Sequence, residues 1–415
     1  MNTQITTLAN GMRIVTEYMG NVETATLGVW VDMGTRFETS ELNGISHLFE
    51  HMAFKGTESR TAQQIVEEIE DVGGWLNAYT SREVTAYYAK VLKENVKTAI
   101  DVISDILLNS SFPQDELDKE KEVVVQEIMQ NFDDPDDLVF DHFQKLAYPE
   151  HSLGMPILGS VDTVRKMTRD NLFDVMAKNY KANRMVFAVA GNVQHEKVVE
   201  MVKPYFEKLT ASKEVILTTP QYQGGYFFEK RPIEQANVVV GFNGVSCMED
   251  DYYTASVFST AFGGGMSSRL FQEVREKRGL VYTIFSNTSA QKDCGLFSIY
   301  AGCGVEEVTE LLDVVRDEIL KTSKGFDIKE IKRAKAQIKA SILMSLESTS
   351  SRSEQSARQL MIFKRIIEPQ ELVAKIEAVD NLALINFAEK VFSSKPSVAM
   401  IAPKESEKAQ SFSLN

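Results

Sequence analysis

The sequence is poor in the residues that build covalent or membrane-spanning scaffolds. Its 415 residues include three cysteines, Cys247, Cys294 and Cys303, which are too few and too scattered for a disulfide framework or a cysteine-based zinc finger. No apolar run reaches about 18 residues, so we expect no transmembrane helix. Residues 1–20 lack the apolar region of a secretory signal. These absences predict a globular chain in a reducing compartment, which we expect to be the cytoplasm.

Positive charge is scarce relative to negative charge. Lys and Arg number 45 against 59 Asp and Glu, which gives a formal net charge of −14. Such a balance disfavours the phosphate backbone of nucleic acids and suits a cationic partner, although a solvated acidic surface explains it as well. We expect neither a nucleic-acid nor a membrane partner. The composition, 43% apolar and 25% charged, is that of an ordinary globular protein.

Two halves of the chain carry related patterns of residues. Segment 47–74 aligns with 255–279, and the predicted helix 115–128 aligns with 329–342. The two alignments have nearly the same offset, as a diverged internal duplication would produce. We therefore expect two domains with one fold.

The stretch 209–225 is rich in Thr, Ser and Gly and predicts a linker. Residues 1–208 would then form one domain and residues 226–415 the other. Alternating strand and helix patterns in each half predict an α+β fold, with a mainly antiparallel sheet packed against helices. Local signals add a hairpin at Asn10-Gly11, a strand at 23–33, a helix at 44–54, two strands within 76–92 and a long helix at 113–132.

His47 and His51 form the sharpest chemical feature of the sequence. They lie four residues apart in the predicted helix 44–54, so their rings stack along one face. Two such rings can share a metal ion, and Glu50 beside them can take a proton from a metal-bound water without being a ligand. The order H-x-x-E-H is the inverted form of a catalytic zinc motif. Because the chain has only five histidines, ordinary core or surface histidines explain this placement poorly.

A metal site of this kind needs a third protein ligand. Glu120 and Glu127 lie seven residues apart in the predicted helix 113–132, which places both on one face after two turns. Glu116 and Glu122 are also present, so the same side chains could belong to a solvated acidic face. Helix geometry alone leaves both interpretations open.

At these residues the chain resembles the pitrilysin/insulinase family of inverted-motif zinc metallopeptidases, in particular its mitochondrial-processing-peptidase beta branch and bacterial homologues. The resemblance runs over most of the chain and implies two homologous domains that form half of a clamshell chamber. It is carried by HLFEHMAFKGT (47–57), LNAYTSRE (76–83), EKEVVVQEI (120–128) and LVYTIFSN (280–287).

The resemblance implies roles for the residues of the motif. His47, His51 and Glu127 would bind one Zn²⁺ per chain, because the family's third ligand lies 76 residues after the second histidine. Glu50 would be the general base, and Glu120 matches the accessory glutamate of the family.

Other residues match features of the family that bind substrate. Asn77 and Ala78 match the edge strand that pairs with the substrate backbone. Arg275 and Tyr282 match a pair that binds the substrate and helps to polarise its scissile carbonyl. We expect the second half to act as a substrate clamp without a metal. The positions there that are equivalent to His47, Glu50, His51, Glu120 and Glu127 hold Ala255, Phe258, Ser259, Ala334 and Ser341.

Asp137 and Asp141 lie ten and fourteen residues after Glu127. The resemblance implies that they bind an arginine two residues before the cleavage site. On a helix, residues four apart can both reach one guanidinium. An acidic segment that only aids solubility is the alternative.

Taken together, the sequence predicts a zinc metalloendopeptidase that cleaves short or unfolded basic peptides containing arginine. One chain carries both the metal motif and the Arg275/Tyr282 pair, which favours a homodimer and leaves a heterodimer with a related chain open. Two alternatives remain. One is a general oligopeptidase without arginine preference, and the other is a non-catalytic structural subunit of the same fold, as in respiratory complexes.

Overall fold

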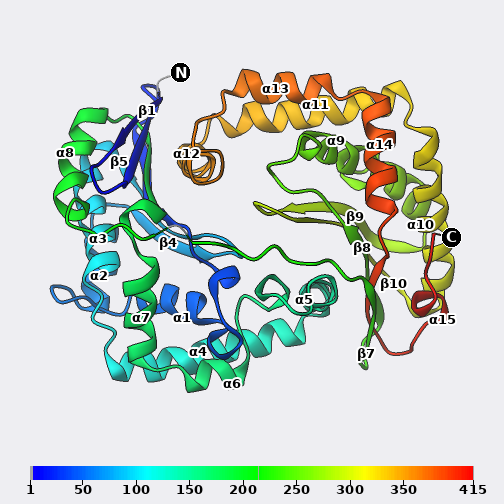
Figure 1. Cartoon of the computed structure of the whole chain (residues 1–415), viewed down its shortest axis with the longest axis horizontal. Coiled ribbons are helices and arrows are strands. Elements are labelled where there is room, and N and C mark those ends of the chain that lie inside the picture. The colour runs from blue at the N-terminus through cyan, green and yellow to red at the C-terminus, as the bar shows by residue number, and fades with distance from the viewer. Residues whose placement is uncertain (1–2, 214, 415) are drawn as a thin grey trace. The chain divides into compact units, whose positions relative to one another are not determined.

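The computed structural model describes residues 3–213 and 215–414 and forms two compact units, each built from three segments of the chain. Each unit contains one sheet with helices packed against it, so the predicted α+β fold is confirmed (Figure 1). Unit 1 comprises Met1–Met129, Pro156–Leu217 and Met344–Glu368, and unit 2 comprises Gln130–Met155, Thr218–Leu343 and Pro369–Asn415.

Unit 1 is organised around a six-stranded sheet with the order β1-β2-β6-β3-β5-β4. Its neighbouring strands are antiparallel except for β2 and β6, which are parallel. The predicted hairpin joins β1 to β2, and Gly11 adopts the left-handed conformation that its turn requires (φ 88°). The strands are β1 (Thr3–Thr7), β2 (Arg13–Tyr18), β3 (Thr24–Val31), β4 (Trp75–Thr80), β5 (Thr85–Leu92) and β6 (Met185–Gly191).

Helices cover both faces of this sheet. The larger core lies on one face, and α12 packs on the other, where Ala357, Leu360 and Met361 meet Trp30 of β3. The predicted helices 44–54 and 113–132 correspond closely to α1 and α4. The helices of the unit are α1 (Ile45–Met52), α2 (Ala62–Glu70), α3 (Val96–Leu108), α4 (Gln114–Asp133), α6 (Val161–Lys166), α7 (Arg169–Asn179), α8 (His195–Phe206) and α12 (Thr349–Phe363), with the end of α4 reaching into unit 2.

Unit 2 repeats the strand pattern of unit 1 without its first strand. The order is β7-β11-β8-β10-β9, and only the pair of β7 and β11 is parallel. The same connectivity and the same parallel pair occur in β2-β6-β3-β5-β4, as expected for two domains of one fold. The strands are β7 (Gly225–Lys230), β8 (Gln235–Asn243), β9 (Val281–Ala290), β10 (Gly295–Gly304) and β11 (Ser397–Ala402).

The helices of unit 2 include one from the first half of the chain. Val139, Phe143 and Ala147 of α5 pack against residues of β8 and β11. No helix among the described residues is long and apolar enough to cross a membrane. The helices are α5 (Pro135–Ala147), α9 (Tyr252–Gly263), α10 (Val308–Lys321), α11 (Ile328–Ser345), α13 (Pro369–Ala378), α14 (Asn381–Phe392) and α15 (Glu407–Gln410).

The two units are therefore not two contiguous halves of the chain, because each unit contains a helix from the other half. The sheets fall on either side of the predicted linker 209–225, whose described residues from 210 to 224 form neither helix nor strand. However, α5 belongs to unit 2 and α12 belongs to unit 1. Amphipathic patterns show that each helix has an apolar face, but they do not show which sheet that face covers.

Candidate metal centre

The helix α1 begins at a buried carboxylate. Gly44 precedes it in the left-handed conformation (φ 95°) and offers no side chain to cap the first amides. Glu38 supplies the acceptors instead. Its Oε2 accepts from the backbone N–H of Gly44 at 2.8 Å, and its Oε1 accepts from that of Ser46 at 2.8 Å. The start of α1 is therefore fixed by a residue six positions before Gly44.

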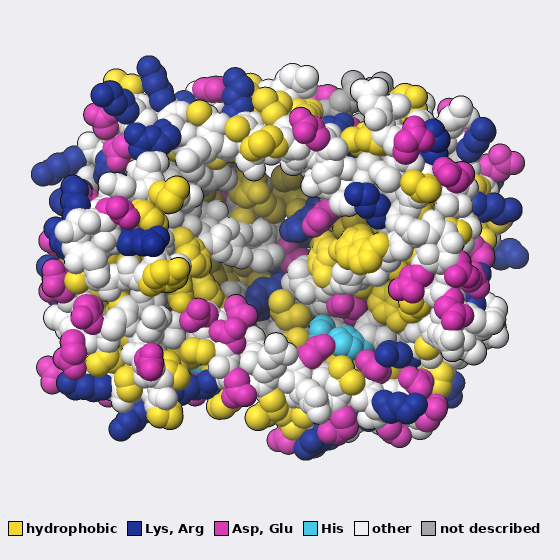
Figure 2. All heavy atoms as spheres, turned by 180° about the vertical axis from the view of Figure 1, so that it is seen from behind, with side chains coloured by type: hydrophobic (Ala, Val, Ile, Leu, Met, Phe, Trp, Pro, Cys, Tyr) yellow, Lys and Arg dark blue, Asp and Glu magenta, His cyan; other side chains and the backbone are white. Residues whose placement is uncertain are grey.

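The apolar face of α1 determines where its polar residues point. Leu48, Phe49 and Met52 are buried in the core of unit 1. His47 and His51 lie on the opposite side and are only half-buried. In Figure 2 histidine side chains reach the surface of unit 1 among acidic and hydrophobic side chains.

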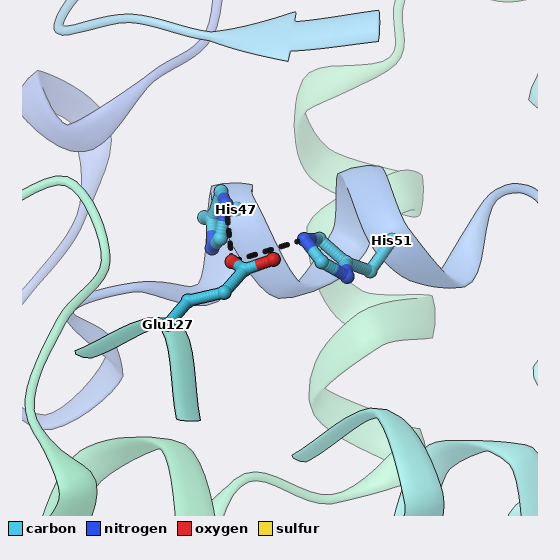
Figure 3. A group of neighbouring side chains, drawn as sticks. All are labelled: His47, His51 and Glu127. Carbon is cyan, nitrogen blue, oxygen red and sulfur yellow. Dashed lines mark ion pairs between the residues drawn. The ribbon is translucent and has the colours of Figure 1, made fainter. Parts of the chain in front are cut away.

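His47, His51 and Glu127 converge on one point between α1 and α4 (Figure 3). Oε2 of Glu127 lies 3.6 Å from Nε2 of His47 and 3.5 Å from Nε2 of His51. One donor atom from each of the three residues lies within 4.8 Å of the other two. The structure thus brings together the three residues that the resemblance implied as ligands.

The spacing of these atoms fits a metal ion. Donors bound at about 2 Å in a tetrahedral zinc site lie about 3.3 Å from one another. The two distances of 3.5 and 3.6 Å from Glu127 are close to this value. Two imidazoles and a carboxylate are also a donor set that zinc accepts. The residues present therefore fit a divalent metal of the zinc type.

The surroundings shift the pKa values of the two histidines in opposite directions. Burial, with a smaller effect of His51, lowers the pKa of His47 to about 4, so its imidazole is neutral, as a metal ligand must be. Burial also acts to lower the pKa of His51. The hydrogen bond with Glu120 and the nearby Glu127 and Glu50 outweigh it, so the pKa of His51 is raised.

Glu120 lies behind His51 rather than among the three converging residues. Its Oε2 is 3.1 Å from Nδ1 of His51, and its Oε1 is 2.6 Å from Nζ of Lys55. Burial acts to raise the pKa of Glu120, but these two contacts lower it overall, so the carboxylate is ionised at neutral pH. A carboxylate bonded to the second nitrogen of a metal-binding histidine fixes the orientation of the ring.

Glu50 is held at the edge of the sheet of unit 1. The hydroxyl of Thr80, the last residue of β4, donates to its Oε2 at 2.6 Å. Burial raises the pKa of Glu50 despite this hydrogen bond. A carboxyl with a raised pKa next to a metal site suits the exchange of a proton with water.

The strand β4 forms the edge of this sheet and leads directly to Thr80. Asn77 and Ala78 lie in β4 opposite Tyr88 and Tyr87 of β5. The N–H of Ala78 donates to the side chain of Asn77 at 2.8 Å. An edge strand can add an extended peptide, as was predicted for these two residues.

Arg275 and Tyr282 lie in unit 2 and contact each other. Arg275 belongs to a π-helical turn, Phe271–Glu276, and its guanidinium carbon lies 5.3 Å from the ring centre of Tyr282. The ring of Phe271 supports the same guanidinium from 4.8 Å. Tyr282 is 76% exposed, so the pair presents a stacked, accessible cation and phenol.

Asp137 and Asp141 also lie in unit 2, four residues apart on α5. Burial, with repulsion from Asp134 and Asp136, raises the pKa of Asp137. Its carboxylate therefore lies where negative charge is crowded and a cation is favoured.

Three residues that contact the site went unnoticed in the sequence. Thr80 lies within the family segment 76–83, and Lys55 lies within the family segment 47–57. Lys55 follows His51 by four residues, and this helical spacing is the one signal that could have identified Lys55. Glu38 precedes α1 in an irregular segment, and no pattern links it to the helix.

A two-domain α+β chain that gathers two histidines and a glutamate from two helices, with a further carboxylate in the inverted motif, has the architecture of an inverted-motif metallopeptidase. Comparison with known proteins leads to the same class. Residues 13–161 match the profile of "Insulinase (Peptidase family M16)", and residues 166–338 match that of "Peptidase M16 inactive domain". The chain belongs to peptidase family M16, which confirms the predicted family and the metallopeptidase class.

Relatives cover nearly the whole chain. An uncharacterized zinc protease of Rickettsia felis is 38% identical over 97% of this chain and 98% of its own length. The probable beta subunit of the mitochondrial processing peptidase of Arabidopsis thaliana is 38% identical over 97% of this chain and 78% of its own length. The crystal structure of a protease from Helicobacter pylori matches this chain with a TM-score of 0.89 at 23% identity. The match covers 97% of this chain and 99% of the Helicobacter chain. At this low identity, the structural match shows a shared fold alone.

Proposed function

We propose that the chain is a zinc-dependent endopeptidase with its catalytic centre in unit 1. The observation that carries the proposal is the convergence of His47, His51 and Glu127 beside Glu50. Zinc held by the three converging residues would polarise the scissile carbonyl and lower the pKa of a bound water. The names of the Rickettsia and Arabidopsis relatives, a zinc protease and a processing-peptidase subunit, support this metal and this reaction.

Residues of the chain perform the remaining steps. Glu50, oriented by the hydroxyl of Thr80, takes a proton from the attacking water and returns it to the leaving amine. An extended peptide adds to β4 beside Asn77 and Ala78. Arg275 and Tyr282, held against each other, stabilise negative charge on the carbonyl oxygen.

The first test combines metal content with hydrolysis. The purified parent protein should contain about one zinc per chain and cleave a quenched basic peptide, and a chelator should abolish the cleavage. His51→Ala should lose both zinc and activity. Glu50→Gln should keep zinc and lose at least 100-fold in kcat, a magnitude typical of general-base removal. The exposed Glu67→Gln is the control. Native activity in Glu50→Gln would contradict the role of Glu50.

We further propose that the substrates are short or unfolded basic peptides in which Asp137 and Asp141 bind an arginine. The crowded negative charge around Asp137 supports this preference. The double variant Asp137→Asn/Asp141→Asn should lose its preference for arginine two residues before the cleavage site. The matched control is Asp115→Asn/Asp118→Asn, which removes the same charge from the first turns of α4 and should keep the preference for arginine. Equal rates on peptides with and without that arginine would favour a general oligopeptidase instead.

The assembly and location belong to the same proposal. We propose a homodimer in the cytoplasm, because one chain carries both the metal motif and the Arg275/Tyr282 pair. One chain in a structure of complex III2 from Candida albicans has the same fold as this chain. The TM-score is 0.86 at 20% identity, and the match covers 98% of each chain. Sedimentation of the purified protein, alone and with a related chain, separates a homodimer from a heterodimer. A metal-free parent protein that stays inactive with added zinc would favour the non-catalytic role.

A further inference from the structure

Lys55 completes a chain of contacts that begins at a histidine of the metal centre. Nδ1 of His51 faces Oε2 of Glu120 at 3.1 Å, and Oε1 of the same carboxylate faces Nζ of Lys55 at 2.6 Å. Each oxygen of Glu120 therefore has one partner. The side chain of Glu120 is 8% exposed and that of Lys55 is 29% exposed, so this ion pair is shielded from solvent on its carboxylate side.

The backbone around Lys55 is fixed by its neighbours. The N–H of Lys55 donates to the carbonyl of Met52 at 3.2 Å, which continues the turn of α1. Beyond it, the carbonyl of Gly56 accepts from the N–H of Ser111 at 3.1 Å, and the hydroxyl of Thr57 donates to Asp105 of α3 at 2.7 Å. Lys55 thus projects from an anchored turn, unlike most surface lysines, whose ion pairs contribute little.

A buried carboxylate with one partner removed is free to turn and carries an uncompensated charge. Without Lys55, Oε1 of Glu120 would have to find another donor, and Oε2 would no longer be held at Nδ1 of His51. The ring of His51 would lose the contact that aims its Nε2 at Glu127, 3.5 Å away. Groups that hydrogen-bond to metal ligands hold those ligands in orientation in this way.

We propose that Lys55 is a positioning residue of the metal centre, which acts through Glu120 to hold His51 in its metal-binding orientation. The inference rests on the proposed function, since it presumes that this centre binds zinc. It concerns affinity for the metal, and Lys55 itself touches neither the metal nor the substrate.

The test measures the dissociation constant of Zn²⁺ by competition with a chromophoric chelator at fixed pH. Lys55→Met should weaken zinc binding by about 10-fold, the lower end of the range for substitutions of groups that orient a metal ligand. Lys55→Arg should restore most of the affinity, because it keeps a donor for Oε1 of Glu120. The matched control is Lys93→Met, which removes an exposed ion pair with Glu23 and should leave affinity unchanged.

A double-mutant cycle tests whether Lys55 acts through Glu120. In the Glu120→Gln background, Lys55→Met should weaken zinc binding no further. Additive losses, or parental affinity in Lys55→Met, would overturn the inference. If Lys55→Met does not fold, Lys55→Gln takes its place in the cycle. If the parent binds zinc and all Lys55 variants bind it equally well, only this inference is refuted. If the parent binds no zinc, the proposed function is refuted as well.

Discussion

Substituting Glu38 by glutamine tests whether a buried carboxylate holds the metal-binding helix in place. Its two oxygens accept from the backbone N–H groups of Gly44 and Ser46, and Oε2 also accepts from the side chain of Asn43 at 3.0 Å. Glutamine keeps one acceptor oxygen and turns an NH₂ group toward one of these donors. That donor is then buried without a partner.

Two opposing effects set the size of the change. An unsatisfied buried donor costs about 1–3 kcal/mol. Burial, however, raises the pKa of Glu38 in spite of its hydrogen bonds, which shows that the ionised carboxylate carries a desolvation cost that glutamine removes. If the lost hydrogen bonds dominate, as we expect, the net loss is about 2 kcal/mol. This corresponds to about a 30-fold increase in local opening, at 1.36 kcal/mol for each factor of ten.

Hydrogen exchange of the α1 amides measures this opening directly. Glu38→Gln should lower the protection of Ile45–Met52 by about 30-fold, while exchange in α14, in the other unit, should not change. Glu41→Gln alters an exposed glutamate three residues away, whose carboxylate accepts from the hydroxyl of Ser40 at 2.9 Å, and should have no effect. Unchanged or increased protection in Glu38→Gln would refute the reasoning, because it would mean that desolvation outweighs the hydrogen bonds.

Three further predictions concern stability and the chemistry of the site. Arg60→Met removes the cation shared by Glu68, Asp101 and Asp105, and should lower the free energy of unfolding by about 3 kcal/mol, seen as a lower melting temperature. In the metal-free protein, the lowered pKa of His47 favours the neutral form on folding, so its contribution to stability is present above about pH 6.5 and is lost as pH falls toward 4. The loss reaches about 3 kcal/mol at most, and in denaturant melts at several pH values the parent should lose more stability than His47→Gln as pH falls toward 4. Arg275→Lys keeps the charge but not the planar group that stacks on Tyr282, so peptide hydrolysis should fall at least 10-fold with zinc content unchanged.

Local rules were enough to predict the parts of the site that lie within single helices. The spacing of His47 and His51, and of Glu120 and Glu127, follows from 3.6 residues per turn, and in the structure both glutamates face α1. Geometry alone did not separate a ligand from a solvated acidic face, and the resemblance to a family was needed to choose Glu127. The two glutamates also differ in burial, since the side chain of Glu120 pairs with Lys55 and is buried whereas that of Glu127 is only half-buried.

Contacts between distant segments were not predictable in this way. Thr80 reaches Glu50 only because β4 is the edge strand beside α1, and the sequence does not reveal the order of strands in a sheet. Glu38 meets α1 through an irregular segment that has no periodic signal. The exchange of α5 and α12 between the units is a similar case, since an apolar helix face does not itself show which sheet it covers.

The exchange of α12 has a consequence for synthesis on the ribosome. The sheet of unit 1 is complete once β6 has emerged at Gly191, yet the helix that covers its second face begins at Thr349. About 160 residues separate the two, which is roughly 10 to 30 s of translation at 5–20 residues per second. During that interval the indole of Trp30 and its apolar neighbours Val15 and Val186 lack their cover. We therefore expect chaperones to bind the nascent chain during this interval, and the first half expressed alone to aggregate.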